Sequence, residues 1–308
     1  VHGTGEASRT QRAMAAARQK VALGMSKIVQ EELDIGRVRL GLRRTPGRGN
    51  PVVMLHGIMD SAISWDAFAR SISRPTIAFD LPGFGQSTLA GDDLDEWQKI
   101  YASALKKLGA ERYFLLGHSL GGALASSMAS ARPDETRGLL LIAPAGYGRI
   151  PLAQFLARPE IEFVLGRTAP EAMRIRPLVR LAYRNLFSHQ HQLSDDLMGR
   201  VTEARHTMVP GIRKAMKVLR RLSQDPFRES GYEGTVATLW GEHDHLVPPG
   251  RTMHGLLKVF ADAHEETFEN IGHHPQEECP SETLSWIAQW SESRIREPLM
   301  LTAGEPLG

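Results

Sequence analysis

The sequence predicts an α/β fold in which a mostly parallel sheet carries helices on both faces and a helical cap is inserted. Short, continuously apolar segments alternate with helical segments from residue 51 to residue 142, and apolar segments resume after residue 235. This alternation is typical of a parallel sheet covered on both faces. Residues 148–230, between the two parts, have helical spacing and no convincing strand. The simplest interpretation is one α/β core interrupted by a helical insertion.

Residues 1–33 are expected to form an N-terminal helical extension. Apolar residues recur there at steps of three and four, as on one face of a helix: Met14, Ala17, Val21, Met25 and Ile28. Basic residues surround this face, so a membrane-surface helix is one interpretation. A helix packed on the domain or on a partner is the favoured one.

The remaining elements follow in order. Residues 35–42 alternate apolar and polar, as in a half-exposed strand. The predicted core strands are residues 51–55, 76–80, 112–116, 138–142, 235–240 and 266–269, and the predicted core helices are residues 94–108 and 122–130. We therefore expect a core of residues 34–147 and 231–293, a cap of residues 148–230 and a tail of residues 294–308.

The strongest chemical signal is Gly117-His118-Ser119-Leu120-Gly121, which follows a strand and precedes a helix. A G-x-S-x-G sequence in this context predicts a sharp turn that lifts a serine hydroxyl off the sheet edge. The flanking glycines remove Cβ atoms that would clash in such a turn. Ser119 is thus the candidate nucleophile.

A serine nucleophile needs a histidine base and an acid that orients the base. Proteins with this motif carry the acid and then the histidine later in the chain. Asp244 follows the strand at residues 235–240, with Glu242 as a competing acid. Two adjacent histidines, His273 and His274, follow the next strand, and spacing alone does not choose between them. No metal site is predicted, because the histidine pair has no partner at a recognised ligand spacing.

The sequence resembles the α/β-hydrolase family in five blocks that occur in family order. The resemblance rests on His56-Gly57, the DLPGFGQS segment at 80–87, GHSLGG at 117–122, GEHD at 241–244 and GHHPQEECP at 272–280. It implies an eight-stranded type of sheet, a helical lid and a serine hydrolase that needs no cofactor.

The resemblance also implies roles for single residues. The family pattern G-H-x-P-x-x-E-x-P places the catalytic histidine at His273, and the acid position falls on Asp244. The backbone N–H groups of Leu120 and Ile58, with Met59 as the alternative to Ile58, would form the oxyanion hole.

The charge of the chain is unevenly distributed. Residues 149–228 contain 15 Lys and Arg against 7 Asp and Glu, a local net of +8, so the remainder carries −6 of the overall +2. This basic cap either draws anionic substrates or a membrane surface towards the site, or consists of solvated helix faces, and the second interpretation is favoured. Aromatic residues are sparse among these basic residues, so nucleic-acid binding is not expected.

The expected function is hydrolysis of a small to medium carboxylic ester with an apolar portion. Carbon–carbon bond hydrolases, acyltransferases and ligand receptors can carry the same triad, and the segment at 139–148 resembles members with the first two activities. Ser119, where dehalogenases and epoxide hydrolases of this fold have an aspartate, argues against those chemistries. The single cysteine, Cys279, allows no internal disulfide and is expected to be a bystander, and we expect a cytoplasmic location. The oligomeric state is left open.

Overall fold

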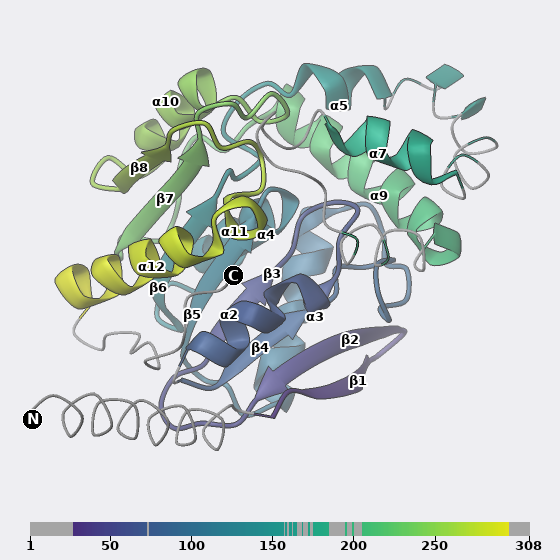
Figure 1. Ribbon diagram of the computed structural model, residues 1–308. Coiled ribbons are helices and arrows are strands. Elements are labelled where there is room, and N and C mark those ends of the chain that lie inside the picture. Colours follow the sequence, from purple (N-terminus) through teal and green to yellow (C-terminus); the bar gives the residue numbers. More distant parts are fainter. Residues whose placement is uncertain are drawn as a thin grey trace, which may run out of the picture.

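The computed structural model (Figure 1) describes residues 27–295 except residue 73 and, between α5 and α9, residues 157, 159, 162, 165–167, 169–171, 173–174, 185–194, 196–198 and 200–204. Eight strands form one sheet in the order β1-β2-β4-β3-β5-β6-β7-β8. Only β2 runs against the other seven, because it is antiparallel to both of its neighbours and every remaining pair is parallel. The predicted α/β class with a mostly parallel sheet is confirmed.

The bounds of the strands agree with most of the predicted segments to within two residues. They are β1 (Val29–Ile35), β2 (Val38–Thr45), β3 (Val52–Leu55), β4 (Thr76–Phe79), β5 (Tyr113–His118), β6 (Thr136–Ile142), β7 (Val236–Gly241) and β8 (His264–Phe268).

The start of the described chain differs from the expectation. Instead of one strand at residues 35–42, the structure has a hairpin of β1 and β2, turned at Gly36, whose φ of 62° suits a residue without Cβ. Residues 29–33 are therefore strand, although we expected them to end the helical extension. The helix expected before them lies outside the described residues, as do residues 296–308 of the tail.

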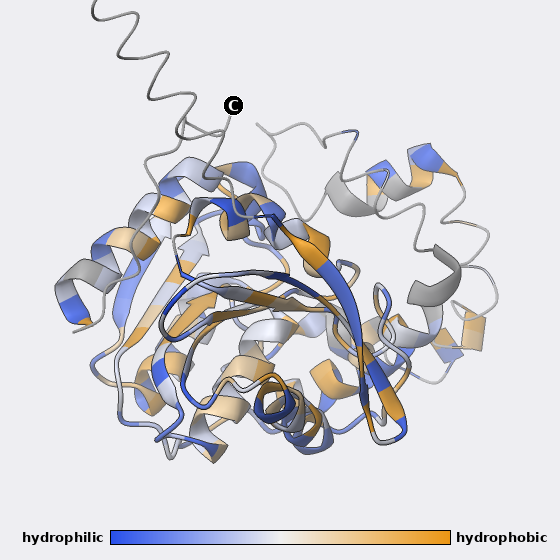
Figure 2. Cartoon of the chain, turned by 90° about the horizontal axis from the view of Figure 1, so that it is seen from below, coloured by the Kyte–Doolittle hydropathy of each residue, from blue (hydrophilic) through white to orange (hydrophobic). Residues whose placement is uncertain are grey.

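The core lies on both faces of the sheet, because successive side chains of a strand point to opposite sides. On β5, Tyr113 and Leu115 join one buried cluster, which includes residues of α3 (Leu94–Lys107), α4 (Leu120–Ala131) and α10 (Pro249–Val259). Phe114 and Leu116 join the other, with residues of η1 (Ala62–Trp65), α2 (Asp66–Ser71) and α12 (Pro280–Arg294). Hydrophobic colour accordingly follows the strands in the interior of the molecule (Figure 2).

Helix α3 shows how local sequence fixes an element. The Asp93 side chain accepts a hydrogen bond from the Asp95 amide (3.0 Å) and so caps one of the unpaired N–H groups of the first turn. Acidic residues at the N-terminus and Lys106 and Lys107 at the C-terminus match the helix dipole. Trp97 and Tyr101 are buried on the face towards the sheet.

Between β6 and β7, where the cap was expected, the described residues include the helices α5 (Pro151–Leu156), α7 (Arg176–Arg184) and α9 (Arg205–Gln224). They lie together beside the sheet (Figure 1), and the described residues of 148–230 contain no strand. Helix α9 approaches the core closely, since a Cβ on Gly211 would lie 2.2 Å from the Gly83 carbonyl oxygen. The division of the chain into extension, core, cap and tail stays a prediction. Within the described part, none of the helices has the length and apolar character needed to cross a membrane.

Candidate active site

Ser119 lies at the junction of β5 and α4 in a strained conformation. Its φ of 53° and ψ of −117° are unusual for a residue with a side chain. The turn is held by the Ser119 amide, which donates to the Ile142 carbonyl on β6 (2.9 Å). Its glycines are required by close approach: a Cβ on Gly121 would lie 2.3 Å from the Leu55 carbonyl oxygen and one on Gly117 would lie 2.4 Å from the Gly121 carbonyl oxygen. The predicted strand–turn–helix geometry is therefore present.

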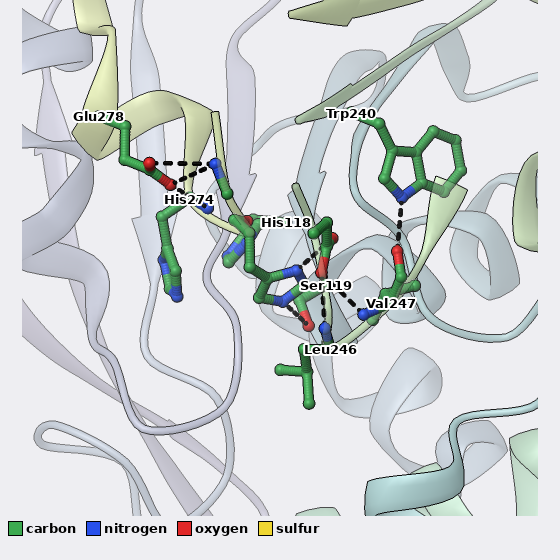
Figure 3. Close-up of polar contacts among 10 residues, drawn as sticks. His118, Ser119, Trp240, Leu246, Val247, His274 and Glu278 are labelled. Carbon is green, nitrogen blue, oxygen red and sulfur yellow. Dashed lines mark hydrogen bonds and ion pairs between the residues drawn. The ribbon is translucent and has the colours of Figure 1, made fainter. Parts of the chain in front are cut away.

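Asp244 lies in the loop after β7 and is almost fully buried. Its Oδ1 accepts hydrogen bonds from the amides of Leu246 (2.9 Å) and Val247 (2.8 Å). The loop is fixed in turn by Trp240, whose indole N–H donates to the Val247 carbonyl (3.0 Å) (Figure 3). These contacts hold the carboxylate in one orientation and leave Oδ2 for another donor.

His273 lies in the turn between β8 and α11 (Pro275–Glu278). The amides on either side of it, those of Gly272 and His274, donate to the buried carboxylate of Glu278, at 3.0 and 3.2 Å (Figure 3). Glu278 thus fixes the backbone that carries His273. We did not predict this role, although Glu278 occupies a fixed point of the family pattern.

The structure brings Ser119, His273 and Asp244 into one chain of hydrogen bonds. The Ser119 Oγ is 3.0 Å from His273 Nε2, and His273 Nδ1 is 2.6 Å from Asp244 Oδ2. All three residues are at most 2% exposed. A carboxylate oxygen only accepts, so Nδ1 carries a proton, and in the neutral ring Nε2 is left to accept the serine proton.

The competing candidates lie elsewhere. Glu242 is exposed, and its carboxylate accepts from the Asn270 amide (3.1 Å). The His274 ring packs against His118, with 4.7 Å between ring centroids.

His118 contacts the turn that bears His273, a role that the sequence pattern did not reveal. Its Nε2 lies 2.9 Å from the His273 carbonyl oxygen, so this nitrogen carries the proton and donates. Its Nδ1 is buried with no hydrogen-bond partner among the described residues. Burial, reinforced by the neighbouring His273, lowers the pKa of His118 well below its ordinary value. A neutral His118 therefore ties the nucleophile turn to the histidine turn.

The two segments expected to supply the oxyanion hole meet at Ser119. Leu120 is the first residue of α4, where N–H groups have no partner within the helix. The loop of Ile58 passes close to the same turn, because a Cβ on Gly57 would lie 3.2 Å from the Ser119 Cβ. Met59, the alternative donor, has a φ of 65°. Among the described residues, neither the Ile58 nor the Leu120 amide has a recorded acceptor.

His56 and Asp80 support this loop. His56 Nδ1 donates to the Gly57 carbonyl (2.7 Å) and its Nε2 accepts from the Leu81 amide (2.9 Å). The Asp80 carboxylate accepts from the amides of Ala62 (2.7 Å) and Gln86 (2.9 Å). Both side chains are thus engaged in holding loops.

Other chemistries have less support in the described chain. No three His, Cys, Asp or Glu side chains of its described part converge as metal ligands. Cys279 donates to the Pro275 carbonyl (3.3 Å), and burial raises the pKa of its thiol to about 12. The thiolate that a cysteine nucleophile requires is therefore disfavoured.

The chain resembles known proteins over most of its length. A family model described as the Alpha/beta hydrolase family matches residues 52–286. The chain is 27% identical over 252 residues to the dihydrolipoyllysine-residue acetyltransferase component of an acetoin cleaving system from Cupriavidus necator, which covers 75% of this chain. This chain spans about 62% of the length of that acetyltransferase component.

Two further likenesses cover larger shares of the matched proteins. The 2-hydroxy-6-oxo-6-phenylhexa-2,4-dienoate hydrolase of Comamonas testosteroni is 26% identical over 253 residues, which cover 77% of this chain and 85% of that protein. The structure of a thermophilic esterase from Thermogutta terrifontis has a TM-score of 0.65 at 19% identity and covers 86% of this chain and 98% of that one. At this identity the structural likeness concerns the fold.

Proposed function

Since the chain belongs to the alpha/beta hydrolase family, we propose that it cleaves small to medium carboxylic esters through an acyl-enzyme on Ser119. One observation carries the proposal: the buried hydrogen-bond chain from Ser119 Oγ to His273 Nε2 and from His273 Nδ1 to Asp244 Oδ2. This chain contains a nucleophile, a base and the acid that orients the base.

In the first step the Ser119 oxygen attacks the ester carbonyl carbon while its proton passes to His273 Nε2. Asp244 holds the imidazole through Nδ1 and stabilises the positive charge that forms on the ring. Because Asp244 is fixed by the amides of Leu246 and Val247, the imidazole needs no reorganisation before the transfer.

The negative charge on the carbonyl oxygen then faces the amides of Ile58 and Leu120. Removing one such donor typically costs about 2.7–4 kcal/mol of transition-state stabilisation. As the intermediate collapses, the C–O bond to the alcohol breaks and His273 returns the proton to the leaving oxygen. Water then attacks the acyl-enzyme by the same sequence, which releases the acid and restores Ser119.

A series of p-nitrophenyl esters with short to long acyl chains tests this proposal. We expect many turnovers per chain, and we expect the Ser119→Ala variant to lose nearly all of the activity. The preferred chain length would report the size of the acyl pocket. Equal, slow rates for the wild-type chain and the variant would contradict the proposal.

Carbon–carbon bond hydrolysis is the second candidate. The segment at 139–148 favours it, and so does the likeness to the Comamonas testosteroni hydrolase over 85% of that protein. Both reactions would use Ser119, so the substrate distinguishes them. Turnover of a 2-hydroxy-6-oxo dienoate at a kcat/KM above that of every ester in the series would favour this candidate.

A further inference from the structure

A surface cavity of about 470 Å³ lies between α5 and the C-terminal end of α9. The described residues that line it are Arg149, Gln154, Arg158, Arg220 and Gln224. They include three guanidinium groups and two amides, and no carboxylate. None of them belongs to the site around Ser119, so this cavity needs an explanation other than the proposed hydrolysis.

The fold builds this cavity with a buried hydroxyl. Ser223, on α9, is 1% exposed. Its Oγ accepts from the Ile150 amide (2.6 Å), just before α5, and from the side-chain amide of Gln154 (3.0 Å). These bonds fix α5 against α9 and hold the Gln154 side chain at the cavity.

Two arginines of the cavity, Arg149 and Arg158, differ from others in the cap. Arg221 and Arg228 face carboxylates, those of Asp92 (3.2 Å) and Asp225 (3.0 Å). Within the described chain, Arg149 and Arg158 have no recorded carboxylate partner.

The Arg158 guanidinium instead lies 5.5 Å from the centroid of the Phe155 ring. Such a contact is a cation–π interaction and uses none of the N–H donors as a hydrogen bond to a carboxylate.

We infer that this cavity binds a phosphate monoester group, carried either by a small metabolite or by a lipid headgroup. The like charges of Arg149 and Arg158 repel each other across the cavity, and a phosphate dianion relieves that repulsion more than a singly charged carboxylate does. Phosphate oxygens also match the planar donor geometry of guanidinium groups. The volume leaves room for the organic part of the ligand beside the phosphate.

Calorimetric titration of the full chain with glycerol 3-phosphate tests the soluble source, with glycerol as the uncharged control. Sedimentation with vesicles of phosphatidylcholine, with and without phosphatidic acid, tests the lipid source. Saturable binding of glycerol 3-phosphate at one site per chain, or sedimentation that requires phosphatidic acid, supports the inference and identifies the source. Absence of both would overturn it.

Variants assign the binding to the cavity. Arg149 and Arg158 are exposed, so Arg149→Gln and Arg158→Gln are expected to fold, which circular dichroism verifies. Each should weaken binding by about tenfold or more, the value of a charge-assisted hydrogen bond. The matched control, Arg228→Gln, also removes one charge from the cap but lies outside the lining of the cavity. Equal weakening by the control would overturn the inference, because general charge attraction would then explain the binding.

Discussion

Two positions apart in the sequence, Glu242 and Asp244 lie in opposite environments. The Glu242 side chain is about half exposed, whereas Asp244 is buried against His273. Both are acids that follow β7, so local pattern alone favoured Asp244 without excluding Glu242. The distinction arises from contacts with a turn about thirty residues away, which no short motif contains.

The first prediction concerns this pair of acids. Asp244→Asn should lower kcat for a p-nitrophenyl ester by about four orders of magnitude, since an amide no longer holds the imidazole in the tautomer that accepts the serine proton. Glu242→Gln is the matched control and should leave kcat unchanged. A large loss of kcat in Glu242→Gln with little effect of Asp244→Asn would show that Glu242, and not Asp244, is the acid.

The second prediction concerns His118 and pH. Burial lowers the pKa of His118 in the folded chain. Below about pH 6.5 the unfolded chain therefore binds a proton at this histidine, whereas the folded chain does not. The free energy of unfolding should therefore decrease with falling pH, by up to about 1.4 kcal/mol per pH unit from this group. His118→Gln keeps a donor for the His273 carbonyl but does not titrate, so its stability should depend less steeply on pH. Urea denaturation from pH 7 to pH 5 measures this dependence. The same change in the free energy of unfolding with pH for the wild-type chain and for His118→Gln would contradict the prediction.

At the scale of elements, the turn from β5 into α4 requires a residue without a Cβ at position 121. Gly121 lies against the carbonyl oxygens of Leu55 and His56, at 2.3 and 2.4 Å from where a Cβ would be. Backbone atoms cannot move aside as the end of a flexible side chain can. The nucleophile turn and the loop of Ile58 are thus packed as one unit.

A third prediction follows from this packing. Gly121→Ala should destabilise the fold by about 3 kcal/mol or more, the upper range for overpacking, and should reduce activity because Ser119 and Ile58 separate. Gly250→Ala, in α10, is the matched control. A Cβ there meets nothing within 4 Å, so the substitution should stabilise the chain by about 0.5–1 kcal/mol. Similar unfolding midpoints for the two variants would contradict the packing argument.

At the scale of the whole molecule, a hydroxyl and an ion pair both hold the helices between β6 and β7 in place. Ser223 is buried and satisfies the Ile150 amide, whereas Arg221 reaches the carboxylate and the backbone carbonyl of Asp92 at the surface. Exposed ion pairs contribute about 0–1 kcal/mol, because water screens them. A buried N–H that loses its acceptor costs about 1–3 kcal/mol.

The fourth prediction is therefore that Ser223→Ala lowers the free energy of unfolding more than Arg221→Gln does. The smaller side-chain change should have the larger effect, because it leaves the buried Ile150 amide without an acceptor. Chemical denaturation of both variants measures the difference. A greater loss for Arg221→Gln would show that surface charge dominates this contact.

Much of the molecule could be predicted from its sequence, because the parallel core strands are continuously apolar and their turns carry glycine motifs. The hairpin of β1 and β2 could not, since β1 is largely polar and its alternation blends into the preceding helical periodicity. The contacts of His118 and Glu278 also escaped prediction. They depend on how turns meet at the sheet edge, and His118 lies 155 positions from the carbonyl to which it donates.

The most direct test of the central claim is to map where an organophosphonate probe that mimics an activated ester attaches covalently. We predict one adduct per chain, located by peptide mass spectrometry on Ser119, absent from Ser119→Ala and slowed in His273→Ala. Attachment to another residue, or no attachment to a folded chain, would contradict the claim that Ser119 is the nucleophile.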